Sequence, residues 1–292
     1  MSATLPIPPR IFARLEEHSK RSGVQPQNVE AEQARSLLPH WPDSVRRVPN
    51  VALRSALFGA ISKGHRPYLE RVEINALGGI SILYTGALLD QRDLDVWETV
   101  LHLARMQELG SECRITAYRL LKYLGKTDTG KNRTILDRQL SRMKATALQV
   151  RVGELSYEGS LIHEVYRDHD SRSYVIRLNP KLRVLFLDDQ FTDVDWSVRQ
   201  ALHGRPLAQW LHGFYVSHAR PYNLKVETLH RLCGSRARSL SDFKKDLRRS
   251  LDAVESAGNA AGRPFSYLIE GDLVRVKTTP SPSQRRHLAN KR

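Results

Sequence analysis

This sequence of 292 residues is poor in cysteine, in long apolar runs and in the motifs of catalysis. Its two cysteines, Cys113 and Cys233, lie in apolar contexts, which predicts reduced, buried side chains and excludes a cysteine-based zinc site. No apolar run approaches the roughly 18 residues that a membrane-spanning helix needs, and the first residues lack the apolar core of a secretory signal. The sequence has no glycine-rich phosphate loop and no His-x-His pair. We therefore expect a cytoplasmic protein that needs no cofactor or metal and that acts by binding, not as an enzyme.

Positive charge is what the sequence has in excess. Lys and Arg number 46 against 31 Asp and Glu, which leaves a net charge of +15. Such an excess favours a polyanionic partner, with nucleic acid ahead of an acidic membrane surface. Apolar residues make up 40% of the chain, which is enough for real cores and argues against a fully disordered basic protein.

The segment from Leu224 to Ser256 reads as two helices joined by a short basic turn. Gly234 is suited to stop the first helix, Val226–Cys233, and Ser239 or Ser241 to cap the second. Apolar residues recur in the second helix at steps of three and four and predict one buried stripe: Leu240, Phe243, Leu247, Leu251 and Val254. A helix with this inner stripe and cations on its outer face can enter the major groove of DNA, although a solvated charged helix fits the same pattern.

The same arrangement occurs a second time, upstream. Residues 115–125 (ITAYRLLKYLG) align without a gap with residues 224–234 (LKVETLHRLCG). An amphipathic helix is expected next, at about 134–147, and a further helix at 93–108 precedes the repeat. Strand-like alternation follows each long helix, with turns predicted at Glu158–Ser160 upstream and at Gly271-Asp272 downstream.

Two copies of helix, turn, helix and β-hairpin predict an α+β fold of two tandem winged-helix domains with flexible N- and C-terminal tails. The linker between them is expected near 178–195. The expected division of the chain is a flexible N-terminal segment at 1–40, a first winged-helix domain at 41–180, a second at 181–277 and a disordered basic tail at 278–292.

Several sequence blocks resemble the TrfA family of plasmid replication initiators. They are Trp41–Phe58, Ile82–Gly86, Val96-Trp97, Arg142–Ala147, Val184–Phe186, Leu224–Thr228 and Leu232–Gly234. The resemblance implies a tandem winged-helix protein that binds origin direct repeats (iterons) as a monomer, promotes origin opening, and recruits the host initiator and the replicative helicase. It also implies a homodimer that is inactive at the origin or autoregulatory. The stretch Gln33–Leu38 lacks the aromatic end of the clamp-binding peptide of some relatives, which argues against docking on the sliding clamp.

Three groups of cations are predicted to contact DNA. The candidates for base readout, chiefly of guanine, are Arg133, Arg138, Arg142, Arg248 and Arg249. The candidates for phosphate contacts are Lys144, Lys244, Lys245, Arg236 and Arg238. The candidates on the strands of the wings are Arg151, Arg167 and Arg275. Two such helices on one chain would occupy successive major grooves about 10 base pairs apart, which suits direct repeats.

Other functions fit parts of the pattern. A transcriptional repressor with tandem winged helices would make the same DNA contacts. His102 and Arg105 have a spacing found in tyrosine recombinases, but no second arginine, histidine and late tyrosine complete that set. A nickase or a general membrane-surface protein remains as a further alternative class.

Overall fold

The computed structural model describes residues 41–61, 64, 66–105, 112–152, 155–168, 170–186 and 190–290. The segment 1–40, expected to be flexible, lies outside these residues, as does the stretch Gln33–Leu38. The described chain mixes helices with mainly antiparallel strands, so its class is α+β as predicted. Two hydrophobic cores organise it: the first draws on residues from Trp41 to Val194, the second on residues from Val198 to Val276.

Five elements of the first core form a unit that we call the first module. They are β6 (Glu112–Thr116), α5 (Ala117–Tyr123), α6 (Gly130–Lys144), β9 (Glu164–Asp168) and β10 (Ser173–Arg177). β10 pairs antiparallel with both β6 and β9, so the strand before α5 and the hairpin after α6 share one sheet of order β6-β10-β9. Leu120 of α5 and Leu140 of α6 are fully buried in the core that this unit covers.

The second core contains a unit with the same order of elements, which we call the second module. It consists of β12 (Leu224–Lys225), α9 (Val226–Leu232), α10 (Leu240–Ala260), β13 (Phe265–Glu270) and β14 (Leu273–Thr278). Its sheet has the order β12-β14-β13, again with the strand before the first helix paired to the last strand of the hairpin. The hairpin expected around Gly271-Asp272 is therefore confirmed.

The turn that ends the first helix is the same in both modules. Gly125 and Gly234 adopt positive φ angles of 66° and 62°, a conformation that glycine reaches without the steric cost of a side chain. The next amide in each case donates back into the helix, from Lys126 to Leu121 at 2.8 Å and from Ser235 to His230 at 3.2 Å. This bond satisfies a carbonyl at the helix end, as the gap-free alignment of the two segments predicts.

Both second helices begin at a side-chain cap. The Thr129 hydroxyl accepts from the Asn132 amide at 3.2 Å, and the Ser239 hydroxyl accepts from the Asp242 amide at 3.1 Å. α6 therefore begins four residues before the predicted 134. The prediction that Leu240 faces inward is wrong, because its side chain is 46% exposed. Leu240 is the first residue after the cap, and the buried face of α10 begins at Phe243.

The strands directly after α6 do not form the hairpin beside it. β7 (Ala147–Val152) and β8 (Leu155–Gly159) join β3 (Tyr68–Glu73) and β4 (Ile80–Ala87) in a separate sheet of order β3-β4-β7-β8. The prediction of a wing turn at Glu158–Ser160 is therefore wrong. Residues 148–157 span two strands, β7, which pairs with β4, and part of β8, which pairs with β7. The hairpin beside α6 is β9–β10.

The helix α4 (Gln91–Ala104) runs through the first core, next to β5 (Leu89–Asp90), which pairs parallel with β2 (Phe58–Gly59). Asp90 caps α4 in a reciprocal capping box with Asp93. Its apolar residues Leu94, Trp97 and Val100 are at most 1% exposed.

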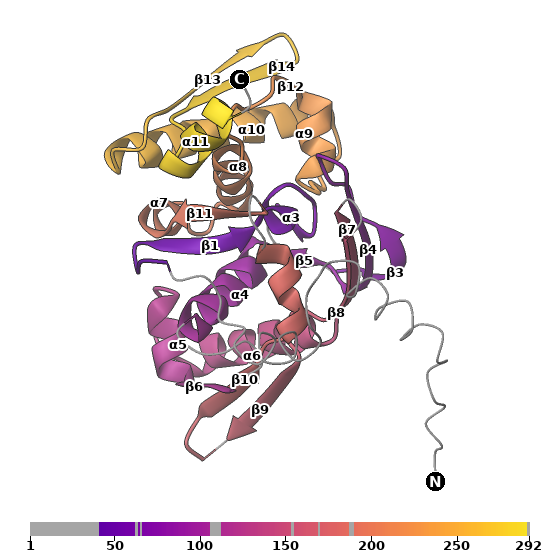
Figure 1. Ribbon diagram of the computed structural model, residues 1–292, viewed down its shortest axis with the longest axis vertical. Coiled ribbons are helices and arrows are strands. Elements are labelled where there is room, and N and C mark those ends of the chain that lie inside the picture. Colours follow the sequence, from indigo (N-terminus) through magenta and orange to yellow (C-terminus); the bar gives the residue numbers. More distant parts are fainter. Residues whose placement is uncertain are drawn as a thin grey trace, which may run out of the picture. The chain divides into compact units, whose positions relative to one another are not determined.

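Six short elements connect the modules. They are β1 (Val45–Pro49), α3 (Asn50–Leu53), the 3-10 helix η1 (Pro180–Phe186), β11 (Phe191–Asp195), α7 (Trp196–Ala201) and α8 (Pro206–Val216). β1 pairs antiparallel with β11, although the two strands are far apart in the sequence. The linker expected near 178–195 thus contains η1 and β11. Figure 1 shows α8 lying below α10, on which it packs within the second core.

The prediction of a disordered tail from 278 onwards is wrong for the described residues at its end. Residues Pro282–Asn290 form the helix α11. The Gln284 side-chain Nε2 atom donates to the Val216 carbonyl of α8 at 2.8 Å, and the Gln284 backbone N–H donates to the Ser281 hydroxyl at 3.2 Å. These two bonds start the helix and attach it to α8.

Candidate DNA-binding surface

The helix α6 buries one face and exposes the other. Leu136, Leu140 and Met143 are at most 1% exposed, as predicted. Arg138 and Lys144 are exposed, so these two predicted contacts lie on the surface of the first module. Lys131 and Thr134 are exposed on the same helix, and neither was among the predicted contacts. Lys131 lies in the first turn, before the predicted start at 134.

Arg142 does not face outward, and the expectation that it does is wrong. Its Nη2 and Nε atoms donate to the two carboxylate oxygens of Asp93 on α4, at 2.8 and 3.1 Å. Asp93 is fully buried and also accepts from Arg66 at 3.1 Å. Burial, followed by repulsion from Asp90, raises the pKa of Asp93, so the carboxylate depends on its arginines to stay charged. Arg142 thus tethers α6 to α4.

Arg133, in the first turn of α6, is bound to the segment between α5 and α6. Its Nε and Nη2 atoms donate to the carboxylate of Asp128, both at 2.5 Å. This contact raises the pKa of Arg133 and lowers the pKa of Asp128. The paired guanidinium is half-buried and carries less free charge toward the surface than Arg138 does.

The outward cations of α10 are confirmed as surface side chains. Phe243, Leu247, Leu251 and Val254 are at most 1% exposed, whereas Lys245, Arg248 and Arg249 are exposed. Lys245 contacts Asp242 at 3.4 Å and Arg249 contacts Asp246, each within one helical turn. Exposed pairs of this kind contribute about 0–1 kcal/mol, so a phosphate or base can displace the acids at small cost.

Lys244 is tied to the hairpin of its own module. Its Nζ atom donates to the Asp272 carboxylate at 2.8 Å and to the carbonyl of Gly271. The pKa of Asp272 is lowered by this contact. Lys244 therefore fixes the β13–β14 turn against α10. Arg275, on β14, pairs with Glu270 at 2.9 Å and lies half-exposed on the same hairpin.

The two strand arginines of the upstream half lie in different sheets. Arg167 is on β9 and donates to Asp137 at 3.1 Å and to Ser141 at 2.9 Å, both on α6, so it joins the hairpin to the second helix. Arg151 is on β7, opposite Ser81 in the four-stranded sheet. The expectation that Arg151 belongs to the wing beside α6 is therefore wrong. Arg172, exposed between β9 and β10, occupies that position instead; the polar run DHDSRS was its sequence signal.

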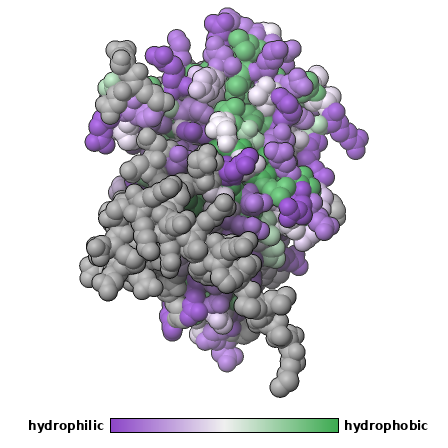
Figure 2. Space-filling view, turned by 45° about the vertical axis from the view of Figure 1, so that its right-hand side comes forward, coloured by the Kyte–Doolittle hydropathy of each residue, from purple (hydrophilic) through white to green (hydrophobic). Residues whose placement is uncertain are grey.

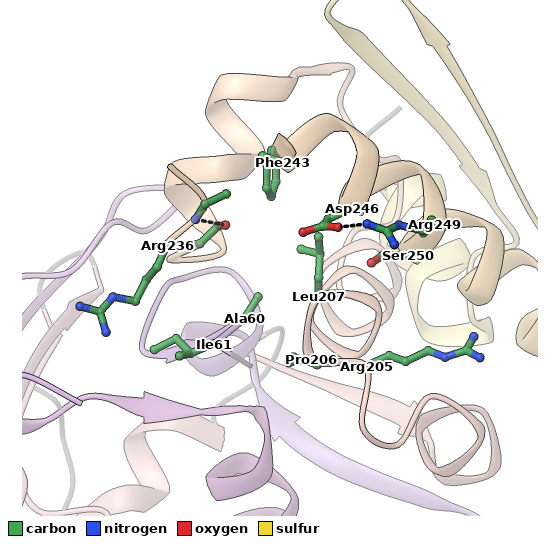
Figure 3. Close-up of a pocket in the computed structure, with 12 residues that line it drawn as sticks. Ala60, Ile61, Arg205, Pro206, Leu207, Arg236, Phe243, Asp246, Arg249 and Ser250 are labelled. Carbon is green, nitrogen blue, oxygen red and sulfur yellow. Dashed lines mark hydrogen bonds and ion pairs between the residues drawn. The ribbon is translucent and has the colours of Figure 1, made fainter. Parts of the chain in front are cut away.

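Arg236 and Arg238 lie exposed in the turn between α9 and α10. Arg236 borders a hollow of about 680 Å³ that reaches from this turn to the segment after β2. Figure 3 shows Phe243, Leu207 and Ala60 around the hollow, while the side chains of Arg236 and Arg205 extend away from it. Arg236 and Arg205 are thus directed toward solvent.

The surface around these elements is polar, and the described residues offer no metal site. On the coloured part of the face in Figure 2, hydrophilic side chains lie on both sides of a hydrophobic band. Within the described ranges, no group of three or more His, Cys, Asp and Glu residues has the arrangement of a metal site. None of the described helices is both long and apolar enough to cross a membrane. Cys113 and Cys233 are free and buried, as predicted.

A repeated unit of strand, two helices and hairpin, with cations on the outer face of the second helix, defines the class: an α+β protein with two helix–turn–helix units on one chain. Residues 21–278 match the model of the family described as TrfA protein, and the chain belongs to this family.

A curated relative and two solved structures are similar to this chain. "Plasmid replication initiator protein TrfA" of Escherichia coli is 30% identical over 227 residues, which are 75% of this chain and 59% of the relative. The chain thus spans about 59% of that protein's length. A crystal structure of RctB domains 2–3 is 14% identical, has a TM-score of 0.50 and covers 78% of this chain and 97% of its own. A selenomethionine structure of RctB domains 2 and 3 is 15% identical, with a TM-score of 0.49, covering 74% and 94%. At this identity, the TM-score of 0.50 supports the fold alone.

Proposed function

We propose that this chain is a plasmid DNA replication initiator that binds iteron direct repeats at its origin as a monomer. Each module would be a winged-helix domain, with the first in residues 41–180 and the second in residues 181–277. The observation that carries the proposal is the duplicated module, in which a cation-bearing second helix lies beside a hairpin. A chain with two such units in fixed order has no two-fold symmetry of its own, which favours direct repeats over palindromes.

The exposed cations divide between base readout and phosphate contacts. Arg138 on α6 and Arg248 and Arg249 on α10 are our candidates for base readout, because they are exposed on the second helices. Lys144 and Lys245 would contact phosphates, which fixes the register of the helices on the duplex. Further phosphate contacts are expected from the turn, hairpin and paired cations: Arg236, Arg238, Arg275, Arg133, Arg167 and Lys244.

The initiator would act by binding energy, without a covalent step. It would promote opening of the origin and recruit the host initiator and the replicative helicase, and a homodimeric form would regulate its own synthesis. A tandem winged-helix repressor would make the same protein–DNA contacts. The two functions differ in the DNA site and in what happens beside it.

Footprinting of the purified chain on its own plasmid origin tests the proposal. We expect protection of direct repeats beside an A+T-rich segment that becomes reactive to single-strand probes. Protection of a palindrome over a promoter, without opening, would favour the repressor. A covalent tyrosyl–DNA adduct would instead reveal an enzyme.

Single substitutions test the residue assignments. Arg248→Ala should cost about 1–3 kcal/mol of binding and relax one position of the site, if Arg248 reads a base. A uniform loss on all sequences would make it a phosphate contact. Arg177→Ala is a matched control, because Arg177 pairs with Glu164 on the β9–β10 hairpin at 3.0 Å and is not among the proposed contacts.

A further inference from the structure

The helix α4 carries an unusual set of buried polar side chains. Asp93 and Glu98 are at most 1% exposed, Gln91 is 1% exposed and Asp95 is 6% exposed. Burying a charged group costs free energy unless partners replace its water. The partners of these four side chains lie on α6 of the first module and on α7 and α8 of the second core.

One side of α4 holds the second helix of the first module. Asp93 receives the two hydrogen bonds from Arg142 of α6. One turn earlier on α6, the buried Gln139 amide donates to the Arg92 carbonyl of α4 at 2.9 Å. These contacts fix both the distance between α6 and α4 and the rotation of α6 about its axis.

Another side of α4 holds the second core through Arg199 of α7. Arg199 is 1% exposed, and its Nε atom donates to Asp95 at 2.8 Å and also forms an ion pair with Glu98. Its Nη1 atom donates to the Gln91 side chain at 3.2 Å. Gln209 of α8 donates to the same Asp95 at 3.2 Å. Because α8 packs on α10, these contacts place α10 relative to α4.

Backbone contacts close the same interface. The Trp210 indole of α8 donates to the Ser55 carbonyl at 3.0 Å, and the Ala60 amide donates to the Cys233 carbonyl at 2.7 Å. A Cβ atom on Gly213 would lie 2.9 Å from the Leu53 side chain, so only glycine permits this approach without a shift. α8 and the second module therefore meet the segment around α3 and β2 through directional bonds, which apolar packing alone would not provide.

We propose that α4 is the common strut that sets the separation and relative rotation of α6 and α10, and that Arg199 is the residue that positions the second module on it. A rotation at the interface would leave Arg199, Asp95 and Glu98 buried without partners, so one orientation is strongly favoured. For its DNA consequence the inference rests on the proposed function: the chain reads its two half-sites at one spacing only.

The first test measures the positions of the two helices without DNA. Thr134→Cys on α6 and Ser256→Cys on α10 place spin labels at two exposed positions of the full chain, and a mock-labelled parent controls for the buried native cysteines. With the two labels and no further substitution, we expect a single narrow distance distribution. Arg199→Ala should broaden or shift it, whereas the control Arg177→Ala should leave it unchanged. Gln209→Ala, which removes only a neutral partner of Asp95, serves as a second variant if Arg199→Ala does not fold.

The second test uses origin fragments with one to five base pairs inserted between the two halves of the footprint. An insertion of about five base pairs turns one half-site to the opposite face of the duplex. On this insertion the parent should bind at least about tenfold more weakly than on the uninserted site, which corresponds to about 1.4 kcal/mol. The folded Arg199 or Gln209 variant should lose less than about threefold between the same two fragments.

Two results would overturn the inference: a folded variant with the parent's distance distribution, or a parent that binds all insertions equally. A parent that does not select origin DNA over competitor DNA would refute the proposed function instead. In that case the label distances alone decide whether α4 and Arg199 set the arrangement of the helices.

Discussion

Replacing Arg142 of α6 by alanine should destabilise the first core, whereas replacing Arg138, one turn away on the same helix, should weaken DNA binding. Both side chains are arginines of an amphipathic helix, and both were predicted to read bases. In the structure Arg138 is exposed and Arg142 is bound to Asp93. The pair of substitutions therefore separates a structural role from a binding role within one helix.

The expected cost follows from the contacts of Asp93. Removing one partner of a buried ion pair typically costs about 3–5 kcal/mol, because the remaining charge is left without compensation. Arg66 still contacts Asp93 at 3.1 Å, and the raised pKa of Asp93 makes uptake of a proton easier. Both effects limit the loss, so for Arg142→Ala we expect about 3 kcal/mol, at the lower end of that range. Arg138→Ala should stay within about 0.5 kcal/mol of the parent.

Urea unfolding of the full chain at neutral pH measures both values, with tryptophan fluorescence as the reporter; two of the four tryptophans, Trp41 and Trp97, lie in the first core. Affinity for origin DNA is measured on each variant below its unfolding transition. The reasoning fails if Arg142→Ala unfolds like the parent but loses as much DNA affinity as Arg138→Ala. That result would mean that Arg142 leaves Asp93 and faces the duplex.

Leu247→Ala should destabilise the second core by about 2–5 kcal/mol, because Leu247 is fully buried and its loss leaves a cavity. An unchanged denaturation midpoint would contradict the assignment of Leu247 to the buried face of α10. Lys245→Ala should lower the slope of log affinity against log salt by about 0.9, as one phosphate contact is lost; an unchanged slope would remove Lys245 from the interface. Burial lowers the pKa of His212 to about 4, from an ordinary value of about 6.5. The folded protein keeps its full stability above about pH 6.5 and loses part of it as the pH falls from about 6.5 toward 4, because the unfolded chain then binds a proton that the buried His212 does not. His212→Gln should reduce this acid loss, by up to about 3 kcal/mol, in denaturation curves measured across that range; an identical pH profile would show that His212 is not the titrating group.

The repeat was predictable because its signals are local. Gly125 and Gly234 end their helices in the same conformation, and Ser239 caps α10 as predicted, whereas the cap at Thr129 was not predicted. Each signal acts within a few residues through hydrogen bonds of the backbone, so a single sequence contains it. The two leucine-rich stripes follow from helical periodicity in the same way.

The hairpin of the first module was misplaced because strand pairing is not local. Residues 148–157 alternate as a wing strand would, but they divide into β7 and β8, and β7 pairs with β4, which lies far upstream in the sequence. Only after this insertion does the β9–β10 hairpin follow, in which β10 pairs with both β9 and β6. In the second module no strands intervene, and there the hairpin follows α10 directly, as predicted.

The buried acids of α4 show why the arginines proposed to contact DNA could not all be told apart from structural ones in advance. In the sequence, Asp93, Asp95 and Glu98 occupy the positions between apolar residues that a solvated helix face would have. Arg142 and Arg199 cover them, one from α6 and the other from α7. An arginine that compensates a distant buried acid and one that faces solvent have the same local pattern, because the difference lies in the partner helix. The count of positive charges therefore indicated a polyanionic partner, while the assignment of each arginine required the packing around α4.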